Sequence, residues 1–128
     1  MKLLLDTRTL LWFLADDPQL SPTAKAGIEN PLTAKYVSVA TCWEIAIKVG
    51  LNKLNLGEPA STFLPRELVA NHFQLLDIGL SHVTRVETLP FHHRDPFDRL
   101  LIAQAMLENI PLVSADAVFD AYGLTHVW

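Results

Sequence analysis

Short apolar runs that alternate with helical patterns are the feature that most constrains the fold of this chain. Residues 2–5 read Lys-Leu-Leu-Leu and show none of the polar alternation of a half-exposed strand. Such a run predicts a strand that is covered on both faces. Strands that alternate with helices predict right-handed βαβ units. The sequence therefore indicates an α/β protein with a parallel sheet and helices on both of its faces.

Capping and breaking residues set the boundaries of the expected elements. Asp6-Thr7 is a typical start of a helix, which Asp17-Pro18 ends, and Ser21-Pro22 opens another. We expect strands at residues 2–5, 36–39, 73–77, 112–114 and 125–127. We expect further helices at residues 22–29, 40–49 (with Gly50 ending this helix), 60–70, 80–88 and 97–108, and a short helix from residue 116.

Length and composition limit the class of protein. The 128 residues, half of them hydrophobic and 19% charged, suit a single domain over residues 1–128 with a real core. The formal net charge of −4 excludes non-specific basic coating of nucleic acid as the main activity. A lone cysteine, Cys42, excludes an internal disulfide and suits a reducing cytoplasm. No apolar run is long enough to span a membrane, so we expect a cytoplasmic protein.

Four acidic residues lie at junctions between the expected elements. Asp6 follows the first strand, Glu44 lies in the helix after the second strand, Asp98 is in the first turn of a helix, and Asp116 follows the strand at residues 112–114. In open parallel sheets the functional crevice lies beyond the carboxyl ends of the strands. We therefore expect the fold to gather these four side chains on one rim.

Each of these acids also has a purely structural explanation. Asp6 and Asp116 have the form of N-caps, and Asp95-Pro96-Phe97-Asp98 has the form of a capped helix start. Thr41-Cys42-Trp43-Glu44 resembles a capping box, with Glu44 at the third helical position. Glu44 is also placed to pair with Lys48 one turn later. For each acid taken alone, the structural explanation and a role in a functional site both stay open.

The conjunction of the four acids favours a cation site. Two like charges about 4 Å apart repel by roughly 4 kcal/mol at an effective dielectric of 20, so such a rim needs protons or cations. Oxygen ligands without a cysteine or histidine set favour Mg²⁺, with Mn²⁺ as the alternative, over zinc. A divalent ion there would activate water for attack on a phosphodiester. Basic residues near the proposed rim are candidates for holding the nucleic-acid backbone: Arg8, Lys48, Lys53, Arg94 and Arg99.

Four stretches of the sequence resemble one known family. They are LLLDTRTLLWFL, YVSVATCWEIAIKVGLNKL, LPFHHRDPFDRLLIAQAM, and IPLVSAD followed by FDAYG. Together they cover almost the whole chain and resemble the PIN domain, and within it the VapC-type toxin ribonucleases of bacterial type II toxin–antitoxin systems. The resemblance implies a three-layer α/β/α fold and a Mg²⁺-dependent endoribonuclease that cleaves RNA by metal-activated water. It also implies regulation by a VapB-type antitoxin.

Carried over by position, the resemblance assigns Asp6, Glu44, Asp98 and Asp116 as the catalytic and metal-binding quartet. It places Thr7 where a small hydroxyl residue orients a water or a carboxylate. Asp95 is a second acidic candidate, as an N-cap or an outer ligand. The hydrophobic composition also leads us to expect exposed apolar surface that suits a homodimer face and an antitoxin groove.

Other interpretations compete with the nuclease. A phosphatase with an aspartyl nucleophile requires a second acid two residues after the first, where this chain has Arg8. A non-catalytic module whose acidic pocket only binds a partner is the second alternative. The pair His92-His93 lacks a third ligand at zinc spacing, which favours a loop contact to RNA or antitoxin. Cys42 is expected to be a small buried residue, and the three tryptophans to be core or interface anchors.

Overall fold

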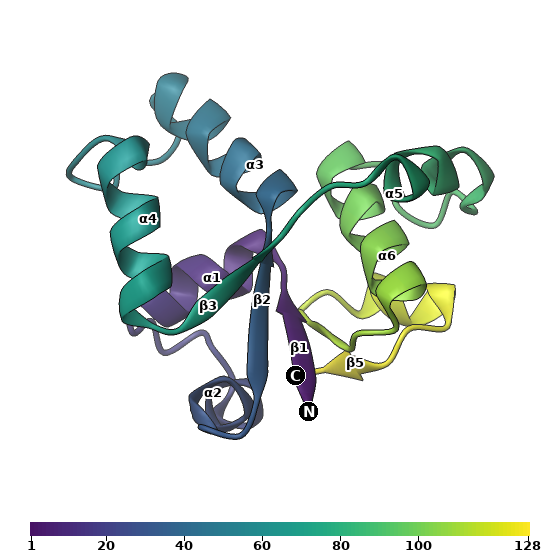
Figure 1. Ribbon diagram of the computed structural model, residues 1–128, viewed down its shortest axis with the longest axis horizontal. Coiled ribbons are helices and arrows are strands. Elements are labelled where there is room, and N and C mark those ends of the chain that lie inside the picture. Colours follow the sequence, from purple (N-terminus) through teal and green to yellow (C-terminus); the bar gives the residue numbers. More distant parts are fainter.

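A five-stranded, all-parallel sheet lies at the centre of the computed structural model, which describes residues 1–128 (Figure 1). The strand order is β3-β2-β1-β4-β5. The strands are β1 (Lys2–Leu5), β2 (Ala34–Ser38), β3 (Phe73–Leu76), β4 (Leu112–Val113) and β5 (His126–Val127). The predicted parallel sheet is confirmed, and β1 lies in its middle.

Helices cover both faces of this sheet and complete the three layers that the resemblance implied. Figure 1 shows α1 to α4 on one side of β1 and α5 and α6 on the other. The helices are α1 (Thr7–Leu14), α2 (Pro22–Glu29), α3 (Val39–Gly50), α4 (Ala60–Ala70), α5 (Leu80–Arg85) and α6 (Pro96–Glu108), with two 3-10 segments, η1 (Val86–Thr88) and η2 (Ala117–Tyr122). None of these helices combines the length and the apolar character needed to cross a bilayer.

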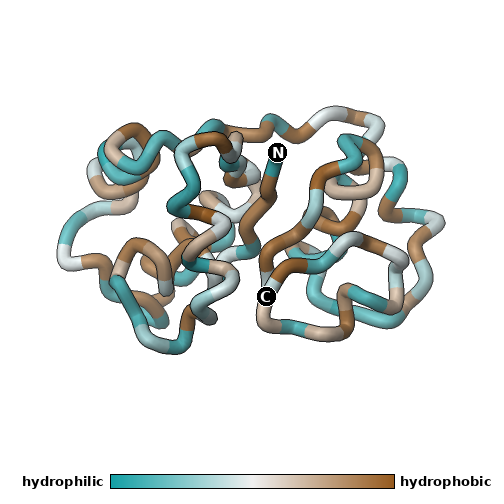
Figure 2. Tube along the Cα trace, turned by 90° about the horizontal axis from the view of Figure 1, so that it is seen from below, coloured by the Kyte–Doolittle hydropathy of each residue, from teal (hydrophilic) through white to brown (hydrophobic).

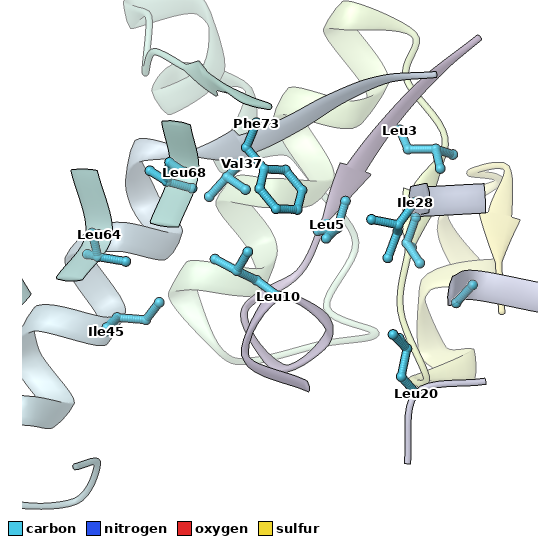
Figure 3. Close-up of a cluster of buried hydrophobic side chains, with 12 residues drawn as sticks. Leu3, Leu5, Leu10, Leu20, Ile28, Val37, Ile45, Leu64, Leu68 and Phe73 are labelled. Atoms are coloured by element: carbon cyan, nitrogen blue, oxygen red, sulfur yellow. The ribbon is translucent and has the colours of Figure 1, made fainter. Parts of the chain in front are cut away.

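The two core clusters show why β1 is apolar at every position but its first. Leu3 and Leu5 belong to the cluster packed by α1 to α4, drawn in Figure 3, whereas Leu4 belongs to the cluster packed by α6 and η2. Successive side chains of a strand point to opposite faces, so both faces of β1 are buried. Each buried leucine stabilises the fold by about 1.5–3 kcal/mol. In Figure 2 a short hydrophilic stretch beside the N-terminus is followed by the hydrophobic remainder of β1.

Most predicted helix starts are confirmed. Asp6, Ser21 and Asp95 each accept a hydrogen bond from a backbone N–H in the first turn of the following helix, and a proline follows Ser21 and Asp95. Asp116 does the same for η2. The expected helix at residues 80–88 divides into α5 and η1. These caps place Asp6, Asp95 and Asp116 at the ends of elements that meet at one edge of the sheet.

The capping box that Thr41-Cys42-Trp43-Glu44 resembles does not form. Helix α3 begins at Val39, where the Ser38 hydroxyl accepts a hydrogen bond from the Ala40 N–H, and it includes Gly50. Glu44 therefore lies in the second turn of α3, with its carboxylate free of any capping role. Cys42 is half-buried against the first core cluster, and burial raises the pKa of its thiol.

Candidate active site

The four predicted acids line a single pocket at the carboxyl ends of β1, β2 and β4. The pocket has a volume of about 250 Å³. Its walls come from segments far apart in the sequence, brought together because parallel strands end at the same edge. The lining residues are Asp6, Thr7, Arg8, Leu11, Glu44, Lys48, Asp95, Asp98, Ser114, Ala115 and Asp116. Of the secondary candidates, Thr7 and Asp95 are in the same pocket as the quartet, and Arg99 is not.

Asp6 is nearly buried, and both of its carboxylate oxygens have partners. Oδ1 accepts a hydrogen bond from the Thr9 N–H at 2.9 Å, which caps α1. Oδ2 accepts one from the Ser114 hydroxyl at 2.6 Å. The second bond joins the ends of β1 and β4, which are neighbours in the sheet. Asp6 is therefore both an N-cap and a wall of the pocket.

Glu44 reaches the pocket from α3 and is held from two sides. Its Oε1 accepts a hydrogen bond from the Thr7 hydroxyl at 2.6 Å, and its Oε2 lies 2.8 Å from the Lys48 ammonium. Both the expected Thr7 interaction with a carboxylate and the Glu44–Lys48 pair are thus present. These contacts orient a carboxylate that is about nine-tenths buried.

Asp98 carries the strongest electrostatic signal of the site. The pKa of its carboxyl is raised from 3.8 to about 7, chiefly by burial. The negative charges of Asp95, Asp6 and Glu44 raise this pKa further, while His93 lowers it. A raised pKa of this kind arises where a carboxyl is buried near other negative charges. Groups with strongly shifted pKa values concentrate at functional sites.

Two residues at the site were not recognised as such from the sequence. Ser114 donates to Asp6 and its oxygen accepts the Asp116 N–H at 3.0 Å, so it links two acids. His93 places Nε2 3.0 Å from Asp98 Oδ2 and 3.4 Å from Asp116 Oδ2. Ser114 follows β4 directly and could have been found by the same rule as Asp6. His93 has no comparable signal, because its loop is positioned only by tertiary contacts.

Arg99 lies elsewhere than expected. Its guanidinium is buried and donates hydrogen bonds to backbone carbonyls. Three of these carbonyls belong to residues 9–13 positions earlier in the sequence. It does not line the pocket, and neither do Lys53 and Arg94. The basic side chains that do line it are Arg8 and Lys48. The interpretation of Arg99 as a surface contact for RNA is therefore wrong.

The residue types of the pocket suit a hard divalent cation. Its polar side chains include carboxylates and the hydroxyls of Thr7 and Ser114, which are oxygen ligands of the kind that Mg²⁺ and Mn²⁺ prefer. No three His, Cys, Asp or Glu side chains are arranged to hold a metal ion. The carboxylates of Asp6 and Glu44 contact Ser114, Thr7 and Lys48 instead. A bound cation would replace some of these partners. The assignment of metal ligands stays a prediction.

Comparisons with known proteins agree with this architecture. The model of the PIN domain family matches residues 3–124. No curated protein matched the chain by sequence.

Solved structures similar to this chain include VapBC2 from Rickettsia felis bound to a promoter DNA fragment (17% identity, 98% of this chain and 97% of that chain, TM-score 0.74). Another is VapC20 of Mycobacterium tuberculosis, a toxin that cleaves the sarcin-ricin loop (15% identity, 95% of each chain, TM-score 0.69). A third is FitAcB from Neisseria gonorrhoeae (18% identity, 97% and 95%, TM-score 0.62). At these identities the likeness shows the shared fold.

Proposed function

The chain belongs to the PIN-domain family, and we propose that it is a metal-dependent endoribonuclease, the VapC-type toxin of a VapBC-type toxin–antitoxin pair. The observation that carries this proposal is the single pocket lined by Asp6, Glu44, Asp98 and Asp116. The raised pKa of Asp98 supports it, because that value reflects burial beside other negative charges. The similarity to VapC20 and other toxin structures favours RNA as the substrate.

We assign Asp6 and Asp98 to the first cation, Asp116 to the same or a second cation, and Glu44 to a water-mediated contact or to orienting the nucleophile. Mg²⁺ or Mn²⁺ bound there would supply water activation and would offset the negative charge that develops on the phosphoryl and leaving oxygens. Thr7 orients the Glu44 carboxylate through its hydroxyl. Ser114 fixes the Asp6 carboxylate against the end of β4.

The basic residues of the pocket suit the phosphate groups that flank the scissile bond. Arg8 and Lys48 line the same pocket as the acids, and Lys48 is close to half exposed. Their charges attract phosphates without sequence preference. These two basic side chains would let a protein with net negative charge hold RNA locally.

Cleavage of RNA that depends on a divalent cation is the expected result for the purified chain. A labelled RNA containing single-stranded loops would be incubated with Mg²⁺, with Mn²⁺, and with EDTA, and its fragments separated by length. We expect internal cuts with either cation, no cuts with EDTA, and recovery when excess Mg²⁺ is added back. RNA that is bound but never cut would favour the non-catalytic binding module, and cleavage unaffected by EDTA would contradict a metal-dependent site.

We propose that the chain forms a homodimer and binds a VapB-type antitoxin. One face of α3 carries Trp43 and Ile47, and the C-cap residue Leu51 follows at the same interval of four residues. All three side chains are exposed. Exposed apolar side chains on one helical face are typical of protein interfaces, so we assign this face to the homodimer. Light scattering on the isolated chain gives the mass of two chains if this is right and of one chain if it is wrong.

The antitoxin is proposed to act on the acidic pocket. An arginine or lysine inserted among the four carboxylates would neutralise the charge that a cation otherwise neutralises, and would block catalysis. Replacing each basic residue of the antitoxin by alanine tests this: inhibition should be lost at one of them. We also propose that the protein acts in the cytoplasm, the reducing compartment that its single cysteine suits.

A further inference from the structure

Both carboxylate oxygens of Glu44 already have a partner within the pocket. Oε1 accepts a hydrogen bond from the Thr7 hydroxyl at 2.6 Å, and Oε2 forms an ion pair with Lys48, whose Nζ lies 2.8 Å away. The Glu44 side chain is only 11% exposed, so water has little access to its charge. A cation held at this carboxylate, directly or through a water, therefore competes with these partners.

Lys48 is the partner of Glu44 that can leave at low cost. Its side chain is 45% exposed, so the ammonium can return to water, whereas Thr7 is buried at the start of α1. A lysine ammonium is a point charge on a flexible four-carbon stem and needs no fixed geometry. Exposed or half-exposed ion pairs four residues apart on a helix are weak. The ion pair therefore neutralises Glu44 without fixing Lys48.

Among the lysines and arginines of the chain, Lys48 alone forms an ion pair with an acid of the pocket. Arg8 also lines the pocket, but its guanidinium lies 5.8 Å from the centroid of the Trp12 ring and pairs with no carboxylate there. An ammonium and a divalent cation repel each other at short range, so they compete for the charge of Glu44. Lys48 thus opposes the cation that the acids attract.

The location of Lys48 also suits an anionic partner outside the protein. Its side chain lines the pocket and is open to solvent near the end of α3. A phosphate beside the scissile bond of a bound RNA would lie at this pocket, and lysine binds phosphates as a point charge. The ammonium can therefore pass from the carboxylate of Glu44 to a phosphate with its charge balanced in both positions.

We propose that Lys48 exchanges partners during the reaction: its ammonium neutralises Glu44, yields this carboxylate to a divalent cation, and then binds a phosphate of the RNA. This inference rests on the function proposed above, because both the cation and the RNA belong to that function. It assigns two effects of opposite sign to one side chain. Lys48 weakens cation binding, and it strengthens RNA binding.

Lys48→Met keeps most of the apolar stem and removes the charge. We expect this variant to bind Mn²⁺ about three- to tenfold more tightly than the unchanged protein, measured by electron paramagnetic resonance of the free ion. In single-turnover cleavage of a labelled RNA at saturating Mn²⁺, we expect the protein concentration at half the maximal rate to rise about three- to tenfold. The loss of a side chain that merely shaped the pocket would weaken both kinds of binding.

Two further variants serve as controls. Lys48→Arg keeps a positive charge on a long stem and should bind Mn²⁺ within about twofold of the unchanged protein. Lys53→Met removes the same charge from an exposed residue that does not line the pocket. Because charges separated by solvent are screened, Lys53→Met should leave the binding of Mn²⁺ and of RNA within about twofold of the unchanged protein.

The outcomes separate this inference from the proposed function. Unchanged or weaker Mn²⁺ binding by Lys48→Met would overturn the exchange of partners, and so would an equal gain for Lys53→Met. An unchanged RNA requirement of Lys48→Met would also overturn it. Each of these results leaves the nuclease proposal intact, because the unchanged protein still binds Mn²⁺ and cleaves RNA. Failure of the unchanged protein to do either would overturn both.

Discussion

Replacing Asp6 with asparagine should lower the rate of RNA cleavage by about 100- to 1000-fold while leaving the protein folded. The expected loss is large because the substitution removes one negative charge from the wall of the pocket in which a cation would be held. The two side chains have nearly the same shape. Single-turnover cleavage at saturating Mg²⁺ measures the rate.

The fold should survive this change because asparagine is as good an N-cap as aspartate. The amide oxygen can still accept the hydrogen bond from the Thr9 N–H that caps α1. The amide nitrogen cannot accept from the Ser114 hydroxyl, but the hydroxyl can rotate and accept from that nitrogen instead. We therefore expect the midpoint of thermal unfolding, followed by circular dichroism, to change little.

Asp17→Asn is the matched control for Asp6→Asn. The Asp17 carboxylate also accepts a hydrogen bond from a backbone N–H, that of Gln19 at 2.8 Å, but it does not line the pocket. This variant should cleave RNA at the unchanged rate. A folded Asp6→Asn protein that cleaves as fast as Asp17→Asn would refute the assignment of Asp6 to catalysis.

The largest loss of stability is expected from Arg99→Lys. The Arg99 guanidinium is 5% exposed and donates to four carbonyls: Nη1 to Pro90 and His93, and Nη2 to Val86 and Leu89. It also lies 4.2 Å from the centroid of the Phe91 ring. This one side chain therefore binds the segment between η1 and α6, including His93, whose Nε2 lies 3.0 Å from Asp98 Oδ2.

Lysine keeps the charge at this position but not the planar fork of donors. Its single ammonium cannot reach carbonyls arranged around two guanidinium nitrogens, so some lose a charged donor. Each such loss in a buried site costs about 1–3 kcal/mol, and we expect the free energy of unfolding to fall by about 3 kcal/mol. Urea denaturation measures this change.

Arg94→Lys provides the comparison for Arg99→Lys. Arg94 lies in the same segment but is exposed, so its substitution should change the free energy of unfolding by less than about 0.5 kcal/mol. If the two variants unfold at the same urea concentration, the buried arginine does not stabilise the segment as its contacts indicate.

The fold could be predicted largely because its strongest signals are local. The run Leu3-Leu4-Leu5 is apolar at each position because α1 to α4 cover one face of β1 and α6 covers the other. Pairs such as Ser21-Pro22 and Asp95-Pro96 mark helix starts by the backbone hydrogen bonds that they satisfy. Neither signal depends on distant residues.

The expected start of α3 at residue 40 is within one residue of the observed start, but the residue that caps the helix was ambiguous because two residues could cap it. Ser38 and Thr41 both carry a hydroxyl, and Thr41 precedes Glu44 at the spacing of a capping box. Helix α3 begins at Val39, so Glu44 falls in its second turn, where its carboxylate accepts from Thr7 on α1. That partner lies 37 residues away, and no local pattern reveals it.

The convergence of the four acids was predictable from topology, whereas the residues that hold them were only partly so. Asp6 and Asp116 follow strands that pair in parallel, so their proximity follows from the sheet. The sequence favours a loop contact to RNA or antitoxin for His93, and for Arg99 a place near the rim where it holds the nucleic-acid backbone. Their partners depend on how residues 89–95 pack against Tyr122 and Phe119, which is set by tertiary contacts. The chemical roles of the acids remain predictions.

Anomalous diffraction from crystals soaked in Mn²⁺ tests most directly whether the four acids form one cation site. The account predicts a manganese peak in the pocket, with the carboxylates of Asp6 and Asp98 turned toward it and Lys48 displaced from Glu44. It is contradicted if the pocket stays free of manganese at concentrations that support RNA cleavage, with each acid still bound to its present protein partner.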